Sequence, residues 1–139
     1  MAIQQSINIT HRDAGRLVRI VEDLLRRANS IEDGAEALHE TLESAHHVSS
    51  AEIEADVVTM NSEVTIEEDT SGARRAIKLA YPLEADPAQG RVSVLSPMGN
   101  ALLGSRVGWI VRFATPLGER SVRIAEIRFQ PEAAAQYDL

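Results

Sequence analysis

Apolar residues in the first third of the chain recur at alternating spacings of four and three positions. One series is Leu17, Val21, Leu24 and Ala28, and a second is Ile31, Ala35, Leu38, Leu42 and Ala45. This spacing places the apolar side chains on one face of a helix and is typical of two helices with facing seams. Only the segment NSIEDG separates the series, so residues 1–50 are predicted to form an antiparallel two-helix coiled-coil hairpin, a short arm. Thr10 and Asp13 have the spacing of a capping box at its start.

After His47 the pattern changes to short, β-branched and partly alternating segments. They are DVVTM, EVTIEE, RRAIKLAY, RVSVL, WIVRFAT and RSVRIAEIRF, and turn-forming residues such as Asn61, Gly72 and Pro87 separate them. Such segments predict an antiparallel sheet over residues 51–139, with Val122 and Ile124 facing inward. The predicted fold class is α+β, an arm of two helices followed by a β-sheet domain with one short helix.

That short helix is predicted within the stretch SVLSPMGNALLGSRVG, residues 93–108. Ser96 can cap the free amides of a first turn, and Pro97 suits the first helical position because its ring fixes φ and its missing N–H is not needed there. Gly104 is placed to end the turn in a left-handed conformation. The local prediction is strand, one-turn helix, strand.

Composition and charge narrow the function classes. The chain has 139 residues, 44% of them hydrophobic, no cysteine, and a formal net charge of −7. Without cysteine there is neither a disulfide nor a thiolate metal site, and without a leader-like or long apolar stretch we expect a cytoplasmic protein that does not bind membranes. The negative charge argues against direct, sequence-specific binding of nucleic acid.

Charge is divided along the arm. The first helix carries five arginines, whereas Glu32, Asp33, Glu36, Glu40 and Glu43 occupy the second half of the hairpin. We expect these charges to pair across the hairpin and to solvate its outer faces. No metal or cofactor is expected, although Glu36, His39, Glu43 and His46 form a stripe with the ligand spacing of di-iron bundles. The inward positions that such a site needs are taken by leucine and alanine.

The predicted tip of the arm holds adjacent carboxylates, Glu32 and Asp33. Two interpretations remain open for them. Carboxylates inside the start of a helix stabilise its dipole, and carboxylates on an exposed loop can instead help to hold Mg²⁺ with ligands from a partner. The chain offers no convincing nucleophile, because no Gly-x-Ser-x-Gly elbow is present and no histidine lies in the sheet half.

Four segments together resemble one bacterial family. They are DVVTMNSEV (56–64), Tyr81-Pro82, SVLSPMGNALLGSRVG (93–108) and FQPEAAAQYDL (129–139). They closely resemble the Rnk proteins, regulators of nucleoside diphosphate kinase, which are relatives of the Gre transcript-cleavage factors. The resemblance implies an FKBP-like, Gre-type C-terminal domain over residues 51–139 that docks on RNA polymerase near its secondary channel, with the arm directed towards that channel.

The same resemblance implies functional residues. Ser96, Pro97, Met98 and Asn100 are the expected polymerase contacts, and Glu32 and Asp33 are the acidic residues at the arm tip. Because the arm is much shorter than a Gre arm, we expect a monomeric or weakly dimeric, non-enzymatic regulator that competes with Gre-type factors without stimulating cleavage. The alternatives are a cleavage-stimulating factor that acts through Glu32 and Asp33, and a self-associating adaptor.

Trp109 departs from the family pattern, in which an acidic residue usually follows the Val-Gly pair. An aromatic side chain there can anchor a partner or close a local core. An FKBP-like domain also raises the question of prolyl isomerase activity, which requires a pocket lined by several aromatic residues. The few aromatic residues of the sheet half are widely spaced, and we do not expect that activity.

Overall fold

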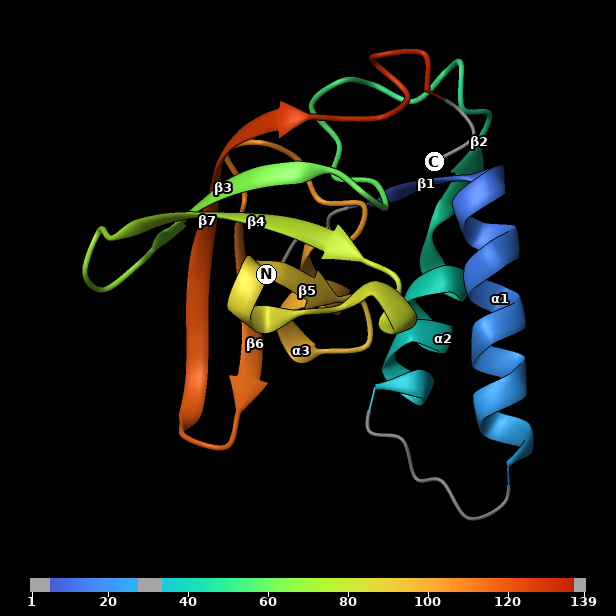
Figure 1. The fold of residues 1–139 in the computed structure, drawn as a ribbon, viewed down its shortest axis with the longest axis horizontal. Helices are drawn as coiled ribbons and strands as arrows, with labels where there is room; N and C mark the ends of the chain where they lie inside the picture. The colour runs from blue at the N-terminus through green and yellow to red at the C-terminus, as the bar shows by residue number, and fades with distance from the viewer. Residues whose placement is uncertain (1–5, 28–33, 137–139) are drawn as a thin grey trace.

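A computed structural model of the chain describes residues 6–27 and 34–136. A helical pair lies beside a curled sheet (Figure 1). The elements in chain order are β1 (Asn8–Thr10), α1 (His11–Arg26), α2 (Ala35–Ser44), β2 (His46–Val48), β3 (Glu63–Glu68), β4 (Arg74–Ala80), the 3-10 turns η1 (Pro82–Glu84) and η2 (Pro87–Gln89), β5 (Arg91–Ser93), α3 (Pro97–Leu102), β6 (Ile110–Thr115) and β7 (Gly118–Phe129).

The predicted helix pair is confirmed, and its described residues bury the predicted seam, whereas Ala28 and Ile31 of that seam lie outside the described residues. Leu17 and Val21 of α1 and Leu38 and Leu42 of α2 are buried. Thr10 caps α1, since its Oγ1 accepts a hydrogen bond from Asp13 N at 3.0 Å. Strands β1 and β2 were not predicted. They pair in parallel, with Ile9 opposite His47, and join the two ends of the hairpin.

The main sheet has the strand order β5-β4-β3-β7-β6. Its β3–β4, β3–β7 and β6–β7 pairs are antiparallel, as predicted, but β5 lies parallel to β4 with Leu79 opposite Val92. The chain returns to this edge through η1 and η2, and this crossover makes a parallel pair possible. Val122 and Ile124 are buried as predicted.

The predicted strand DVVTM is wrong. Residues 56–60 form only an isolated antiparallel bridge, in which Val57 lies opposite Arg106. Val57, Val58 and Met60 are nevertheless buried, because this segment passes through the contact between the helices and the sheet. The β-branched residues of this segment are therefore explained by burial and not by strand pairing.

One hydrophobic core joins both halves of the chain. It contains Leu17 and Leu38 from the helices together with Met60, Ile66 and Ile124 from the second half. The division of the chain at residue 50 into an arm and a separate domain therefore stays a prediction. Among the described helices, none combines the length and the apolar character that crossing a bilayer requires.

Candidate functional site

The helix α3 forms as the sequence predicts. Ser96 Oγ accepts from Gly99 N at 3.1 Å and donates to the carbonyl of Ser93 at 2.6 Å, so a single hydroxyl ties the turn to the strand before it. Pro97 occupies the first turn, and Gly104 ends the segment with a φ of +77°. A Cβ on Gly99 would overlap the carbonyl oxygen of Ser93, so only glycine lets α3 lie this close to β5.

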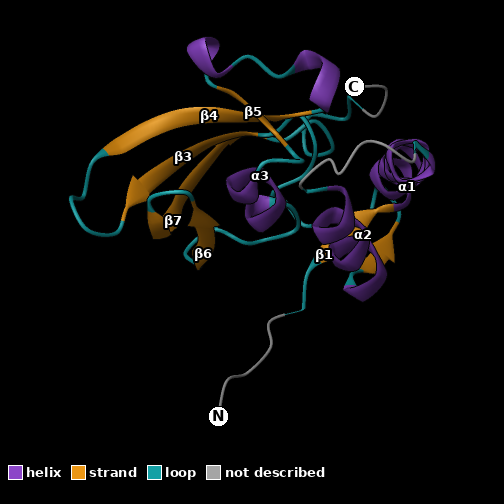
Figure 2. Ribbon diagram, turned by 90° about the horizontal axis from the view of Figure 1, so that it is seen from below, coloured by secondary structure: helices purple, strands orange, loops and turns teal. Residues whose placement is uncertain are grey.

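The helices α2 and α3 meet at a hydrogen bond. Thr41 Oγ1 donates to Asn100 Oδ1 at 2.9 Å. The two helices lie next to one another with β6 nearby (Figure 2). Between these elements lies a groove of about 750 Å³, here called the α2–α3 groove. Its lining residues are Ile7, Gly34, Ala37, Thr41, Leu95, Ser96, Pro97, Asn100, Ala101, Leu103, Arg112, Phe113 and Ala114.

The start of α2 presses against the loop before α3. Gly34 precedes α2 with a φ of +111°, and a Cβ there would overlap the carbonyl oxygen of Leu95. Any other residue would therefore be strained both by its backbone conformation and by this contact. The close approach fixes the arm against one wall of the groove.

The structure brings three of the predicted contact residues together on this groove. Pro97 is exposed, and Ser96 and Asn100 are half-buried. Met98 does not join them, because its side chain is 8% exposed and belongs to the core, with Arg75 Nη2 at 3.9 Å from its sulfur. Met98, the second residue of the six-residue helix α3, faces inward, so we do not retain it as a surface contact. Glu32 and Asp33 lie outside the described residues.

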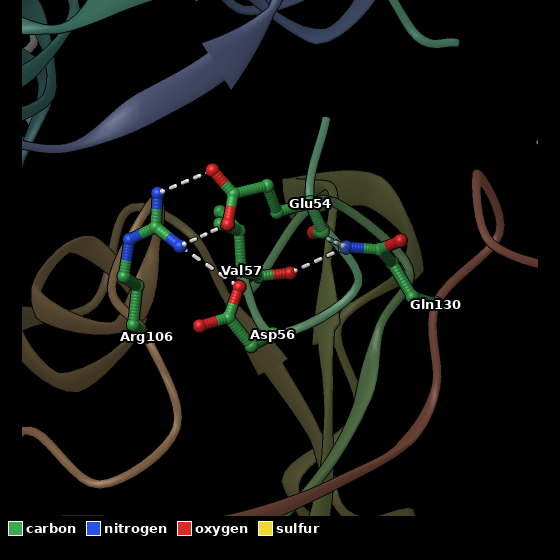
Figure 3. Close-up of polar contacts among 5 residues, drawn as sticks. All are labelled: Glu54, Asp56, Val57, Arg106 and Gln130. Atoms are coloured by element: carbon green, nitrogen blue, oxygen red, sulfur yellow. Dashed lines mark hydrogen bonds and ion pairs between the residues drawn. The ribbon is translucent and has the colours of Figure 1, made fainter. Parts of the chain in front are cut away.

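Behind α3, the motif GSRVG has a structural role. Arg106 Nη1 lies 2.8 Å from Asp56 Oδ1 and 3.0 Å from Glu54 Oε2. Gln130 Nε2 donates to the carbonyls of Glu54 and Val57, each at 2.7 Å. As Figure 3 shows, the side chains of Arg106 and Gln130, which come from different parts of the chain, bind the same loop. The hydrogen bonds to Glu54, together with those to Asp56, raise the pKa of Arg106 above its usual value.

A second polar cluster joins α1 to the rest of the molecule. Asp13 is 2% exposed, and one carboxylate oxygen accepts from Met60 N at 3.0 Å while the other accepts from the Tyr81 hydroxyl at 3.4 Å. Burial raises the pKa of Asp13 to about 6, against the lowering effect of the Met60 N–H and of Arg16. Burial and the nearby Asp13 raise the pKa of Tyr81 as well. The predicted capping box is thus only half formed. The Thr10 side chain caps α1, but the Asp13 carboxylate binds Met60 N and the Tyr81 hydroxyl.

The motif residues around Asn61 and Glu132 also hold the fold together. Asn61 has a φ of +67°, and Thr59 Oγ1 donates to Glu132 Oε1 at 2.7 Å. Thr59 N also donates to Ser62 Oγ at 3.0 Å. The segment around Thr59 and the C-terminal segment therefore bind one another although they lie 73 positions apart in the chain.

The sequence did not reveal every residue of the groove. Thr41, Arg112 and Phe113 come from elements on which we had placed no site. The only signal in the sequence for Thr41 was its position next to Leu42, a buried residue of the seam. Which neighbour it meets depends on how α2 and α3 pack, and no local pattern carries that information.

The predicted stripe of histidines and glutamates does not stay on one element. His39 and Glu43 pair on α2 at 3.1 Å, whereas α2 ends at Ser44 and His46 lies in β2. Within residues 6–27 and 34–136, no three histidine or carboxylate side chains gather closely enough to hold a metal ion. Trp109 is half-buried, and its carbonyl accepts from Ile124 N at 3.0 Å.

Comparisons with known proteins agree on one family. The family model described as "Transcription elongation factor, GreA/GreB, C-term" matches residues 53–129. The "Regulator of nucleoside diphosphate kinase" of Escherichia coli (strain K12) is 38% identical over 104 residues, which cover 74% of this chain and 76% of that protein. A "Transcription elongation factor GreA" of Thermomicrobium roseum is 35% identical over 111 residues, which cover 80% of this chain and 60% of that protein.

A solved structure is similar as well. The "Prokaryotic transcription elongation factor GreA/GreB from Nitrosomonas europaea" has a TM-score of 0.73 and 34% sequence identity, and the match covers 89% of this chain and 100% of that chain. The match therefore includes both the helical part and the curled sheet.

Proposed function

This chain belongs to the GreA/GreB family of transcription elongation factors, and we propose that it is a non-enzymatic regulator that binds RNA polymerase near the secondary channel. In this proposal it competes there with Gre-type factors and does not stimulate transcript cleavage. The residues that make the contact are Ser96, Pro97 and Asn100, on the wall of the α2–α3 groove.

The observation that carries this proposal is the preformed groove between the helical arm and the sheet. Its walls are tied by the Thr41–Asn100 hydrogen bond and by the close approach of Gly34 to Leu95. A surface held in its bound shape loses little conformational freedom on binding, which favours affinity. Pro97 stands exposed at its rim and offers a rigid apolar contact.

The short helices support binding without cleavage. The 16 residues of α1 span about 24 Å and the 10 residues of α2 about 15 Å at 1.5 Å per residue. An arm of this length blocks an entrance near its own body but does not bring side chains to a centre much farther inside. Positioning errors of about 1 Å already reduce catalysis strongly, so delivery of a metal ligand needs the full reach.

A polymerase-binding assay with two matched proline variants tests the proposal. Pro97 and Pro87 are both exposed and both begin a short helix, α3 and η2. We expect Pro97→Glu to weaken binding of core RNA polymerase about tenfold and Pro87→Glu to leave it unchanged. A GreA protein should compete with the wild-type chain. Absence of binding at about 10 μM polymerase, or equal losses in both variants, would contradict the proposal.

The second candidate is a cleavage-stimulating factor that acts through Glu32 and Asp33. It rests on the adjacent carboxylates between α1 and α2. Backtracked transcription complexes incubated with the chain distinguish the two candidates. We expect no cleavage above background, with or without the double change Glu32→Ala and Asp33→Ala. Cleavage that the wild type stimulates and the double variant does not would favour the second candidate.

A further inference from the structure

A second groove lies between α1 and the η1 turn. It has a volume of about 740 Å³ and is called here the α1–η1 groove. Figure 1 shows the chain segment that follows the arrow of β4 passing close to the helical pair. The lining residues are Arg16, Arg19, Ile20, Asp23, Leu24, Arg27, Tyr81, Pro82, Leu83, Glu84 and Leu95. Five of them belong to α1, and Arg27 is its C-cap residue. The six follow helical spacing, so they form one continuous stripe that faces η1.

The groove is apolar along its length. Ile20 and Leu24 lie on the α1 side, and Pro82 and Leu83 lie on the η1 side. Leu83 is fully exposed at 101%. A fully exposed leucine next to further apolar residues in a concavity forms a surface that another molecule can cover.

The rim of the groove is positively charged although the chain as a whole is negative. Its described residues include three arginines and two carboxylates, whereas the whole chain has a net charge of −7. Arg27 is paired with Asp23 at 2.9 Å, and the guanidinium of Arg16 lies 5.9 Å from the centre of the Tyr81 ring. Arg19 is exposed and makes no ion pair with any residue in the described ranges.

The expected charge pairing across the hairpin does not occupy the outer arginines of α1. Like Arg19, neither Arg12 nor Arg26 forms an ion pair within residues 6–27 and 34–136. The side of α1 that carries Arg12, Arg19 and Arg26 is therefore available to carboxylates from outside. At the rim of an interface, such charges steer encounter and orient the partner.

We propose that the α1–η1 groove binds an acidic amphipathic helix of a partner protein. The stripe from Arg16 to Arg27 is about 16 Å long, which matches about three turns of helix. Apolar side chains of the partner lie against Ile20, Leu24 and Leu83, and its carboxylates face Arg19 and the outer arginines. This site is distinct from the α2–α3 groove, with which it shares only Leu95.

Single-stranded RNA fits the groove less well. Such ligands stack bases on exposed aromatic faces and need a dense row of cations. Tyr81 is the one aromatic residue among the described residues of the lining, and Arg16 lies over its ring.

A labelled peptide tests the inference. The probe is a fluorescein-labelled helix of about 14 residues with leucines at spacings of three and four and glutamates on both sides of them. Fluorescence anisotropy should give a Kd of about 100 μM or lower with the wild-type chain. Leu83→Ser and Arg19→Glu should each weaken binding at least about fivefold.

Two variants at other sites serve as matched controls. Leu117 is as exposed as Leu83, at 100%, but lies in the turn between β6 and β7, and Arg128 is exposed on β7. Leu117→Ser and Arg128→Glu should leave the peptide affinity within about twofold. Pro97→Glu should do the same, whereas Leu83→Ser should retain polymerase binding, so failure of one proposal leaves the other intact.

Four outcomes would overturn the inference. The first is no peptide binding up to about 1 mM, and the second is an equal loss of affinity in the control variants. The third is an unlabelled uridine oligonucleotide that binds through Arg19 when the peptide does not bind. The fourth is a dimer, detected by light scattering, that Leu83→Ser dissociates. The third would assign the groove to nucleic acid, and the fourth to a second copy of the chain.

Discussion

Asp13 joins two distant parts of the chain at an electrostatic cost. Its carboxylate accepts a hydrogen bond from Met60 N and lies near Tyr81 and Arg16, but the loss of water outweighs these favourable contacts and raises its pKa to about 6. Glu132 adds a further unfavourable charge. A buried carboxyl of this kind fixes the orientation of α1 relative to Met60, although the protein would be more stable with an uncharged group at this position.

Asp13→Asn should therefore stabilise the protein at neutral pH. The proton binds more tightly to folded than to unfolded Asp13, so folding is favoured below pH 4 and this advantage is lost as the pH rises through about 6. The variant does not undergo this loss, so its free energy of unfolding at pH 7 should exceed that of the wild type by at most about 3 kcal/mol. Urea unfolding between pH 4 and pH 8 measures it. The exposed Glu126→Gln serves as the control, and a variant that is less stable at pH 7 with unchanged pH dependence would contradict the assignment.

Gln130→Met should remove one donor that serves two carbonyls. Gln130 is buried, and its Nε2 bonds to Glu54 and Val57. The similar volume of methionine leaves packing nearly intact. The Glu54 carbonyl keeps the Val57 N–H as a donor at 3.2 Å, but the Val57 carbonyl loses Gln130 Nε2 and the Ala133 N–H loses Gln130 Oε1, and each such loss costs about 1–3 kcal/mol. We expect the free energy of unfolding to fall by about 2–4 kcal/mol in urea. The exposed Gln136→Met should change it by less than about 0.5 kcal/mol.

At the scale of elements, the contact between α2 and the loop before α3 determines the shape of the α2–α3 groove. Gly34 and Thr41 hold it from the helical side, and Leu95 and Asn100 hold it from the other. Neither side forms a stable unit without the other, because a helix of 10 residues is marginal in water and α3 is shorter still. The groove is therefore a property of the packed pair.

Gly34→Ala should disrupt this contact much more than a comparable change elsewhere. Both Gly34 and Gly72 have positive φ, but a Cβ at Gly72 meets nothing within 4 Å, whereas one at Gly34 overlaps Leu95. Gly72→Ala should cost about 1 kcal/mol, and Gly34→Ala at least about 2 kcal/mol more. Chemical denaturation measures both. Equal costs would show that the backbone conformation, rather than the contact with Leu95, decides the position.

At the scale of the whole molecule, the arm and the sheet share one core. Leu17 and Leu38 pack in the same cluster as Met60 and Ile124, and the parallel β1–β2 pair closes the base of the hairpin. The predicted boundary at residue 50 therefore separates two sequence patterns, but residues from both sides of it pack in the same core. Shared burial of this kind makes unfolding cooperative.

Thermal unfolding should therefore show one transition for both halves. Circular dichroism at 222 nm follows mainly the helices, and the fluorescence of Trp109, the single tryptophan, follows the sheet half. We expect the two midpoints to agree, and Leu38→Ala to lower both together, since removal of a buried leucine side chain costs about 2–5 kcal/mol. A helical signal that is lost at a lower temperature than the fluorescence signal would instead support two separate domains.

The sequence by itself determined the helices, the strands β3 to β7 and the family. Periods of 3.6 and 2 residues arise from backbone geometry, so local patterns are enough to recognise them, and the cap at Ser96 and the left-handed Gly104 follow from two or three neighbouring residues. The family followed from the conjunction of four short segments, and the matches over residues 53–129 confirm it.

Only the tertiary structure decided which side chains meet. It buried Met98, paired Thr41 with Asn100, turned the Asp13 carboxylate towards Met60, and placed Arg106 against Glu54 and Asp56. These contacts join residues that lie between 47 and 59 positions apart. Such pairs depend on how whole elements pack, and packing is governed by the total surface that the fold buries rather than by any local period.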